Sequence, residues 1–411
     1  MQLILFEDEG VERFRPLLHL KPVYHLRCGT RSLREKFESA LNLAITLHVR
    51  RSLQNVLREE NPTSLVNEMQ SDDMLFINGR AICDKSLATK IQSEQFEFGK
   101  AYFNGGQVVA FRTNPKEFFA DGLPNLIEAK FISERMPVEQ VDGTLVSFMW
   151  DLIRLHPIEF KREAKQEKRF GMNFGNVHPR AVLVNESRIF IDEGAEVKAG
   201  AVLDADEGYI YISRNATILP NAVLMNNVFV GESATVKIGA KIYSNVYIGK
   251  ASKVGGEVED CIIEPFANKQ HDGFLGHSYI SSWCNLGADT NNSDLKNNYS
   301  TVRMNVGGKE IDSKMQFLGL MMGEHSKSGI NTMFNTGTVV GMSSNIFGAG
   351  FPPKTIGSFQ WGGGDTNFMR YDLEKAIEVA RAVMKRRNIA LTAAYEALFR
   401  QAYHDEMNAP T

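Results

Sequence analysis

The sequence repeats itself every six residues between Ile212 and Val254. Aliphatic side chains recur at that interval, at Ile212, Ile218, Leu224, Val230, Val236, Ile242, Ile248 and Val254. Mostly small side chains follow four residues later, at Ala216, Ala222, Val228, Ala234, Ala240, Val246 and Ser252. An α-helix repeats about every 3.6 residues and a strand every two, so a period of six fits neither. It predicts a parallel β-helix, in which the chain turns a corner every six residues and the aliphatic side chains share one core.

The same six-residue spacing recurs on both sides of this run. Upstream it includes Ile191, Val197 and Leu203, and downstream Phe274, Ile280 and Leu286, then Met322, Ser328, Phe334, Val340 and Ile346. We therefore expect a β-helix over residues 176–360, interrupted by a polar arm at 291–316. From Asp372 to Met407 the apolar residues take helical spacing, which predicts a C-terminal helical segment within 361–411. This segment should pack against the end of the β-helix and cover strand edges.

The first 150 residues have a different pattern. Short apolar runs at 3–6 (LILF) and 74–77 (MLFI) alternate with helix-like stretches such as Ser32–Val49. That alternation is typical of an α/β layer domain. Residues 151–175 contain the charged stretch Lys161–Arg169, which predicts a helical linker exposed to solvent.

The composition excludes several classes of protein. A net charge of −3 argues against nucleic acid as the main partner, because such proteins need a strongly basic face. The four cysteines form no CxxC pair, as expected for reduced thiols in the cytoplasm rather than a zinc site or a disulfide framework. The sequence contains neither a long apolar run nor a signal peptide, so no membrane partner is expected.

Two strings within 262–303 carry a resemblance to a known family: NKQHDGFLGHSY and NLGADTNNSDLKNNY. They resemble the acyltransferase site of the bifunctional enzymes that combine glucosamine-1-phosphate N-acetyltransferase with N-acetylglucosamine-1-phosphate uridyltransferase. Within that family the chain is similar to the branch with a short N-terminal domain. The resemblance implies a left-handed β-helix, a homotrimer, acetyl-CoA bound between subunits, and a role in UDP-N-acetylglucosamine biosynthesis.

An amine that attacks a thioester must lose a proton, and a histidine is the suitable base near neutral pH. Aligning the family's Asn-Ile-Gly-Ala-Gly-Thr string without gaps places the family's catalytic histidine on His271, with His277 as second choice. Phe274 then replaces a substrate-contacting tyrosine. The resemblance also implies that Asn285 and Asn298 contact the amino sugar and that Ala288 contacts acetyl-CoA, while Asp289 replaces a glycine. Cationic side chains must meet the phosphates. We expect Lys269, Lys296 and Arg303 at the sugar phosphate, and Lys327 at the coenzyme, where Lys309 and Lys314 are weaker candidates.

Sugar nucleotidyltransferases of this class begin with a strand and a glycine-rich loop that holds nucleotide phosphates. The GxGTR string of that loop is missing before the RPL here. The residues that could serve instead are Arg13, Arg15, Lys21, Arg27, Gly29 and Lys36, together with Asn78 and Gly79 in the string Phe76-Ile77-Asn78-Gly79-Arg80. The family places an Mg²⁺-binding aspartate where this chain has Arg80, and arginine cannot ligate Mg²⁺. Three possibilities follow: Asp8, Asp72 or Asp73 binds the metal, Arg80 supplies the charge, or the domain has lost nucleotidyl transfer.

Three hypotheses follow. The first is a two-site enzyme that acetylates a hexosamine 1-phosphate with acetyl-CoA, using His271 as base, and then joins the product to a nucleotide. The second is a sugar-1-phosphate nucleotidyltransferase whose β-helix is structural or regulatory. The third is a non-catalytic trimeric binding or scaffold protein, because fold alone does not establish activity. The sequence leaves the sugar, the nucleotide base and the acyl chain open.

Overall fold

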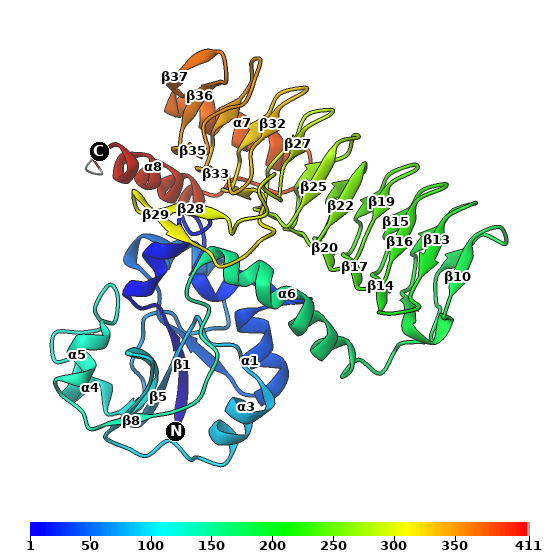
Figure 1. Cartoon of the computed structure of the whole chain (residues 1–411). Coiled ribbons are helices and arrows are strands. Elements are labelled where there is room, and N and C mark those ends of the chain that lie inside the picture. Colours follow the sequence, from blue (N-terminus) through cyan, green and yellow to red (C-terminus); the bar gives the residue numbers. More distant parts are fainter. Residues whose placement is uncertain (409–411) are drawn as a thin grey trace.

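The computed structural model describes residues 1–408. The chain forms an α/β domain, a long β-solenoid and two C-terminal helices, of which the last lies against the α/β domain (Figure 1). No helix in the described part of the chain is long and apolar enough to cross a membrane.

The N-terminal domain is built on a mixed sheet with strand order β4-β1-β5-β7-β6-β8. Strand β1 pairs in parallel with β4 and β5, whereas β7 is antiparallel to β5 and β6. The two apolar runs expected as strands are β1 and β5. The bounds are β1 Gln2–Phe6, β4 Ile45–Leu47, β5 Met74–Asn78, β6 Lys100–Asn104, β7 Gln107–Thr113 and β8 Val138–Gln140.

Successive residues of a strand point to opposite faces of the sheet, and both faces of this sheet are buried. Leu3 and Leu5 join the large core on one face, and Ile4 and Phe6 join the smaller core on the other. The helices of this domain are α1 Leu33–Leu41, α2 Gln54–Glu60, α3 Lys85–Gln92, α4 Pro115–Phe118 and α5 Ala129–Ser133. The helical pattern expected over Ser32–Val49 is shorter in the structure: Asn42, with φ +50°, ends α1, and the chain continues into β4.

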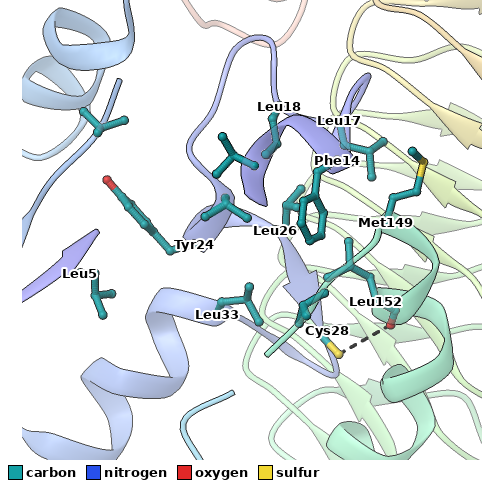
Figure 2. Close-up of a cluster of buried hydrophobic side chains, with 14 of the residues drawn as sticks. Leu5, Phe14, Leu17, Leu18, Tyr24, Leu26, Cys28, Leu33, Met149 and Leu152 are labelled. Atoms are coloured by element: carbon teal, nitrogen blue, oxygen red, sulfur yellow. Dashed lines mark hydrogen bonds between the residues drawn. The ribbon is translucent and has the colours of Figure 1, made fainter. Parts of the chain in front are cut away.

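The expected linker at 151–175 is helical as far as Ala164, but the expectation of solvent exposure is wrong for one face of that helix. Helix α6, Met149–Ala164, buries one face against the domain, including Leu152 and Ile153. Figure 2 shows Met149 and Leu152 beside Phe14, Leu26 and Cys28 in that core. The charged residues Glu159 and Glu163 are buried as well, which the charge pattern alone does not reveal.

The solenoid consists of short parallel strands stacked in three columns. The first column contains β10 Val182–Val184, β13 Val202–Asp204, β16 Val223–Met225, β19 Lys241–Ile242, β22 Glu257–Glu259 and β25 Phe274–Gly276. The second contains β11 Ile189–Ile191, β14 Ile210–Ile212, β17 Val228–Val230, β20 Val246–Ile248, β23 Ile262–Ile263, β26 Tyr279–Ile280, β30 Met321–Met322, β33 Val339–Val340 and β35 Thr355–Ile356. The third begins with β9 Asn176–Val177, β12 Glu196–Val197, β15 Thr217–Ile218, β18 Thr235–Val236, β21 Lys253–Val254 and β24 Asn268–Lys269. It resumes with β31 Lys327–Ser328, β34 Asn345–Ile346 and β36 Gln360–Gly363.

The hexapeptide prediction is confirmed, since all eight aliphatic residues from Ile212 to Val254 are at most 1 % exposed and share one core. The phase expected at Phe274 is wrong by one residue. Leu275 points inward in register with Val258, and Phe274 lies outside. The reason is that the inward residues Leu275 and Ile280 are five positions apart instead of six, across the bend at His277. An earlier coil is shortened as well, since the inward residues Val254 and Val258 are only four positions apart.

The interruption at 291–316 is less polar than expected. It begins with β27, Asn291–Asn292, which pairs with β32, Met333–Phe334, and continues into a hairpin of β28, Arg303–Val306, and β29, Lys309–Asp312. Val302, Met304 and Val306 are buried in the same apolar core as the N-terminal domain. The hairpin therefore connects the solenoid to that domain.

The expected C-terminal helical segment is two helices, α7 Leu373–Lys385 and α8 Ala393–Asn408, preceded by β37, Thr366–Arg370. Strand β37 pairs with β36 and so covers the edge of the last coil. Phe399 of α8 packs edge-on against His325 and Phe359 at a solenoid corner. The same helix contacts α2, so it closes the molecule onto the N-terminal domain.

Candidate functional site

Most residues expected at an acyl-transfer site lie on consecutive coils between Asn268 and Asp294. Lys269 occupies an inward position, in register with Val254, and is 2 % exposed. Its ammonium donates to the carbonyl oxygens of Gly255 at 3.2 Å and His271 at 2.8 Å. Burial lowers the pKa of Lys269 to about 8. Through its two hydrogen bonds the Lys269 side chain fixes the backbone on which His271 lies.

His271 lies on the turn between β24 and β25 and is exposed to solvent. Its carbonyl accepts the bond from Lys269, while its ring has no hydrogen-bond partner among residues 1–408. The neighbouring turn is close, because the amide of Asp289 donates to the carbonyl of Asp272 at 3.1 Å. The imidazole is thus held on a fixed backbone with both nitrogen atoms available.

His277 lies at the next solenoid corner, and its ring, unlike that of His271, is bonded to another side chain. Its Nδ1 lies 2.8 Å from Asp294 Oδ2 and its Nε2 lies 3.6 Å from Asp260 Oδ2. Phe317 stacks on the ring with centroids 5.2 Å apart. Burial disfavours the charge, yet the hydrogen bond with Asp294 and the negative charge of Asp260 raise the pKa of His277. This imidazole holds a proton between two carboxylates.

Asp260 is itself positioned by a column of amides along the corner. Asn227 donates to Asn245 at 2.9 Å, and Asn245 donates to Asp260 at 2.8 Å. These corner residues succeed one another on adjacent coils, and Asn245, Asp260 and His277 have φ values of +59°, +48° and +44°. Asparagine and aspartate tolerate this left-handed backbone better than other residues with a side chain, which explains their recurrence there.

The string NNSD attaches the start of the arm to β25. Asn291 Oδ1 accepts a bond from the amide of Phe274 at 2.8 Å, and Asn292 Oδ1 accepts one from Gly276 at 2.9 Å. A side chain at Gly276 would have its Cβ 2.2 Å from Asp294 Oδ2 and 2.6 Å from the Phe274 ring. Only glycine leaves room for both groups, so Phe274, His277 and Asp294 meet in one cluster.

The residues expected at the coenzyme lie on the following coils. Asp289 has φ +56°, so it occupies the backbone conformation for which glycine is usual. The carbonyl of Ala288 accepts a bond from Asn331 at 2.9 Å, and Asn285 pairs with Asn268 and Lys327 through the backbone. Burial lowers the pKa of Lys327 to about 8, and its ammonium donates to the carbonyl of His325 at 2.8 Å.

The remaining residues predicted to bind the substrate lie on the arm, more than twenty positions after His271 in the sequence. Lys296 donates to the carbonyl of Thr301 at 2.7 Å, and Asn298 accepts a bond from Ser300 at 2.9 Å. Arg303 is exposed and lies 3.8 Å from Glu310. Their hydrogen bonds shape the arm, and only Arg303 extends a largely exposed cation.

At the ends of β1 and β5, Asp8 and Arg80 form a buried ion pair. Arg80 is 1 % exposed; its Nε donates to Asp8 at 2.8 Å and a second nitrogen to Gln107 at 2.9 Å. Asn78 donates to the other oxygen of Asp8 at 2.8 Å, and a Cβ on Gly10 would lie 2.7 Å from the guanidinium. Within residues 1–408 no three His, Cys, Asp or Glu residues are grouped to hold a metal. These residues do not fit Mg²⁺, because Asp8, the carboxylate beside Asn78, is neutralised by Arg80, and the neighbouring Glu7 is paired with Arg50.

The other predicted phosphate-binding cations are paired within the protein. Arg13 donates to Gln107 at 3.1 Å and lies over Phe148, while Arg15 pairs with Glu12 at 2.8 Å. Lys21 forms an ion pair with Glu264 of the solenoid. Arg27 pairs with Glu35 at 2.9 Å and lies over Tyr247, also of the solenoid. Gly79 packs against Tyr24, which leaves no room for a Cβ.

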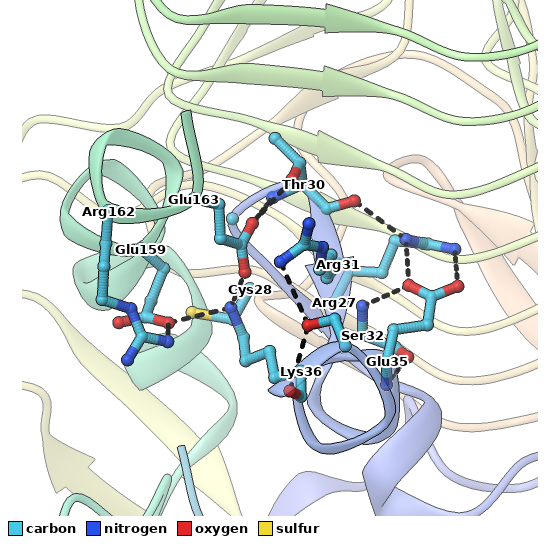
Figure 3. A network of polar contacts seen from close by, with 12 residues as sticks. Arg27, Cys28, Thr30, Arg31, Ser32, Glu35, Lys36, Glu159, Arg162 and Glu163 are labelled. Carbon is cyan, nitrogen blue, oxygen red and sulfur yellow. Dashed lines mark hydrogen bonds and ion pairs between the residues drawn. The ribbon is translucent and has the colours of Figure 1, made fainter. Parts of the chain in front are cut away.

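Lys36 belongs to a buried network between α1 and α6 (Figure 3), and Gly29 packs against the glutamates of that network. Lys36 bonds to Glu163 and, at 2.8 Å, to Glu159. Glu163 also accepts bonds from the amide and hydroxyl of Thr30, at 2.7 Å and 2.6 Å. A Cβ on Gly29, with φ +82°, would lie 2.8 Å from Glu163. The structure thus brings Lys21 and Arg27 to one cavity and separates Lys36, Arg13 and Arg15 from it.

Sequence reasoning missed the two partners of His277. Asp294 lies within the quoted string NNSDLKNNY, so its presence was visible but not its contact across 17 positions. Asp260 directly follows strand β22 and belongs to no recognisable motif. Its position in the corner column, one coil before His277, becomes apparent only when the shortened coil is known.

The family model for sugar nucleotidyl transferases matches residues 3–169. The N-terminal domain matches that family. A bifunctional sugar-1-phosphate nucleotidylyltransferase/acetyltransferase of Sulfurisphaera tokodaii is 28 % identical over 205 residues, 49 % of this chain and 45 % of that protein. The bifunctional protein GlmU of Methanocaldococcus jannaschii is 31 % identical over 126 residues, 31 % of this chain and 25 % of the relative. The chain thus spans less than half the length of these curated relatives.

A solved structure of UDP-N-acetylglucosamine acyltransferase from Campylobacter jejuni aligns with 55 % of this chain and 95 % of its own length. It is 15 % identical and the TM-score is 0.23, which is too low for an inference about activity. The match of residues 3–169 and the two bifunctional relatives agree with the resemblance seen in the sequence.

Proposed function

We propose that the chain is a transferase of amino-sugar metabolism whose solenoid moves an acetyl group from acetyl-CoA to the amine of a hexosamine 1-phosphate. In this reaction the amine nitrogen attacks the thioester carbonyl, His271 takes the proton from that nitrogen, and the C–S bond breaks to release coenzyme A thiolate. The names of the bifunctional relatives support the pairing of a sugar 1-phosphate with acetyl transfer.

The contrast between the two histidines carries the assignment of the base. A general base needs an available lone pair, and His277 is bonded at Nδ1 to one carboxylate and faces a second across Nε2. His271 extends an exposed ring from a turn whose backbone Lys269 fixes. We infer that His277 positions the arm and His271 acts on the substrate.

The remaining roles follow the resemblance. Asn285, Asn298 and Phe274 would contact the sugar, Lys296 and Arg303 its phosphate, and Ala288 and Lys327 the coenzyme. In a homotrimer the exposed turn of His271 would face the neighbouring subunit, where the coenzyme would complete the site. Lys269 would act through the backbone rather than on the phosphate, because its ammonium is inside the solenoid.

The test is a thiol-release assay with acetyl-CoA and glucosamine 1-phosphate. His271→Ala should lower kcat/KM by about 10² or more, the usual scale for a lost general base. His277→Ala is the matched variant and should act mainly on KM and on the order of the arm. Loss of turnover in His277→Ala with normal turnover in His271→Ala would reverse the two roles. Absence of thiol release in the wild type would remove the proposal.

The second candidate function is nucleotidyl transfer to a sugar 1-phosphate, favoured by the family match over residues 3–169. Pyrophosphate release from UTP and N-acetylglucosamine 1-phosphate tests it directly. Because Asp8 is paired with Arg80, we expect little or no stimulation by Mg²⁺. No pyrophosphate release with any nucleoside triphosphate would leave this domain as a binding module. Turnover of either half-reaction would exclude the third hypothesis, a scaffold without activity.

A further inference from the structure

A cavity of about 620 Å³ lies where the N-terminal domain, one solenoid corner and the C-terminal helices meet. Lys21 and Glu60 line it from the first domain, Trp283 and Glu324 from the solenoid, and Tyr395 from α8. This volume is within the usual range for small-molecule sites, roughly 300–1,000 Å³. None of the residues assigned above to acyl transfer lines it.

The walls of this cavity carry an excess of negative charge. Six glutamates line it: Glu35, Glu38, Glu59, Glu60, Glu264 and Glu324. Three cationic side chains of the same cavity form ion pairs with some of these glutamates. Arg27 pairs with Glu35 at 2.9 Å, Arg34 pairs with Glu38 at 2.7 Å, and Lys21 lies between Glu264 and Glu324. Burial lowers the pKa of the remaining basic group, His25, to about 3, so that imidazole is neutral. Glu59 and Glu60 therefore have no ion pair among residues 1–408, and Glu264 and Glu324 share one cation.

Glu324 carries an unpaired polar atom at the wall of the cavity. The residue is 5 % exposed, and its Oε1 lies 3.0 Å from the ammonium of Lys21. Its Oε2 is buried and has no hydrogen-bond partner among residues 1–408. Buried polar atoms are almost always bonded, and an unpaired carboxylate oxygen is costly. Burial raises the pKa of Glu324 to about 7, in keeping with incomplete compensation.

An aromatic wall faces the same space. Trp283 stacks on Phe266 with ring centroids 4.4 Å apart and planes 5° apart, and the ring of His325 lies 6.0 Å beyond. Tyr395 bonds to His325 at 2.8 Å and so fixes α8 against this stack. Aromatic faces attract organic cations, most strongly when the cation is shielded from water. A small organic cation that can lay a face of C–H groups on the indole ring fits both the carboxylates and this wall.

We propose that this cavity binds a small organic ammonium of about the size of a monosaccharide and without a phosphate. The ammonium would donate to Glu324 Oε2 and offset the unpaired carboxylates, while the body of the ligand contacts Trp283. A sugar phosphate is repelled by the same charges. No trio of metal-ligating side chains is grouped within residues 1–408, so a metal ion is not the expected occupant.

Calorimetric titration of the full chain with glucosamine tests the proposal, with N-acetylglucosamine as the neutral control and glucosamine 6-phosphate, which is not a substrate of the proposed reactions, as the phosphorylated one. Glucosamine should bind measurably below about 10 mM, and the two controls at least about tenfold more weakly. Glu324→Gln should weaken glucosamine binding by about tenfold. Glu60→Gln, at the exposed rim, should weaken it about threefold without any effect on folding.

Two further variants separate this site from the others. His271→Ala should leave glucosamine affinity unchanged, because the turn of His271 does not line the cavity. Glu232→Gln removes a surface carboxylate that pairs with Lys250 outside the cavity, and should likewise have no effect. Equal binding of glucosamine and N-acetylglucosamine, or unchanged affinity in both Glu324→Gln and Glu60→Gln, would overturn the proposal. So would loss of binding in His271→Ala, which would assign the amine to the acyl-transfer site.

Discussion

The Lys36 network gives the sharpest test of how the N-terminal domain is held together. Lys36 is 2 % exposed and bonds to both Glu159 and Glu163 of α6. Lys36→Met keeps the length of the side chain and its burial but removes the cation. Removing one partner of a buried ion pair costs about 3–5 kcal/mol, because the other charge remains buried.

The structure favours the lower end of that range. Glu159 retains its ion pair with Arg162, and Glu163 retains the two donors of Thr30. We therefore expect a loss of about 3 kcal/mol in the free energy of unfolding. With a urea m-value of about 2 kcal/mol per M, the unfolding midpoint of this domain should fall by about 1.5 M.

The assay is urea unfolding followed by circular dichroism and tryptophan fluorescence. Lys161→Met is the matched control, because Lys161 is an exposed lysine of α6, the helix that carries Glu159 and Glu163, and it should change stability by less than about 0.5 kcal/mol. Adding Glu163→Gln to Lys36→Met should recover part of the loss, since it removes the uncompensated charge. A midpoint for Lys36→Met equal to that of Lys161→Met would refute the argument that this lysine neutralises the two buried glutamates.

Three other predictions follow from the same structure. The pKa of His277 is raised, so the stability that its charge contributes is fully present below the ordinary value of 6.5 and is lost as the pH rises through the folded value. Hydrogen exchange of amides 291–318, corrected for intrinsic rates, should therefore increase above neutral pH in the wild type but not in Asp294→Asn. Parallel profiles for the two proteins would contradict this. Arg80→Met leaves Asp8 buried without its cation and should lower stability by about 3–5 kcal/mol, with partial recovery in the double variant that adds Asp8→Asn; a calorimetric Tm equal to that of the wild type would count against the ion pair. Burial raises the pKa of all four thiols, to about 12 for Cys83 and Cys284, so a disulfide reagent should label none of them in the native protein and all of them in urea, whereas rapid labelling of any thiol in the native protein would contradict their burial.

The hexapeptide period predicted the solenoid because inward residues recur at a fixed short interval, and the residues stacked on them follow at a multiple of it, as Ile212 pairs with Val230. It failed at Phe274, where the inward residues Leu275 and Ile280 are five positions apart and no local signal marked the shorter step. The α/β character of the first half was likewise visible in alternating apolar runs. The burial of α6 was not, because the partner that neutralises its glutamates, Lys36, is more than 120 positions away.

The candidate site, too, was predicted from the sequence only in part. A string of residues identified the coils that carry His271 and His277, but not which imidazole is engaged. That distinction depends on Asp260 and Asp294, which approach His277 from the preceding coil and from the arm. Similarly, the string Asn78-Gly79-Arg80 revealed a departure from a metal site, whereas the compensating pair with Asp8 required the parallel contact of β1 and β5.

The apolar core shared by the two halves means that the protein cannot be divided into modules. Tyr279 of the solenoid accepts a bond from the amide of Arg27 at 3.1 Å, and Tyr247 of the solenoid lies beneath the Arg27 guanidinium. A cut between residues 169 and 176 would leave each fragment with an uncovered apolar face, prone to aggregation. Any two activities in this chain must therefore be separated by point substitutions within the intact protein, and a silent fragment would say nothing about the site that it carries.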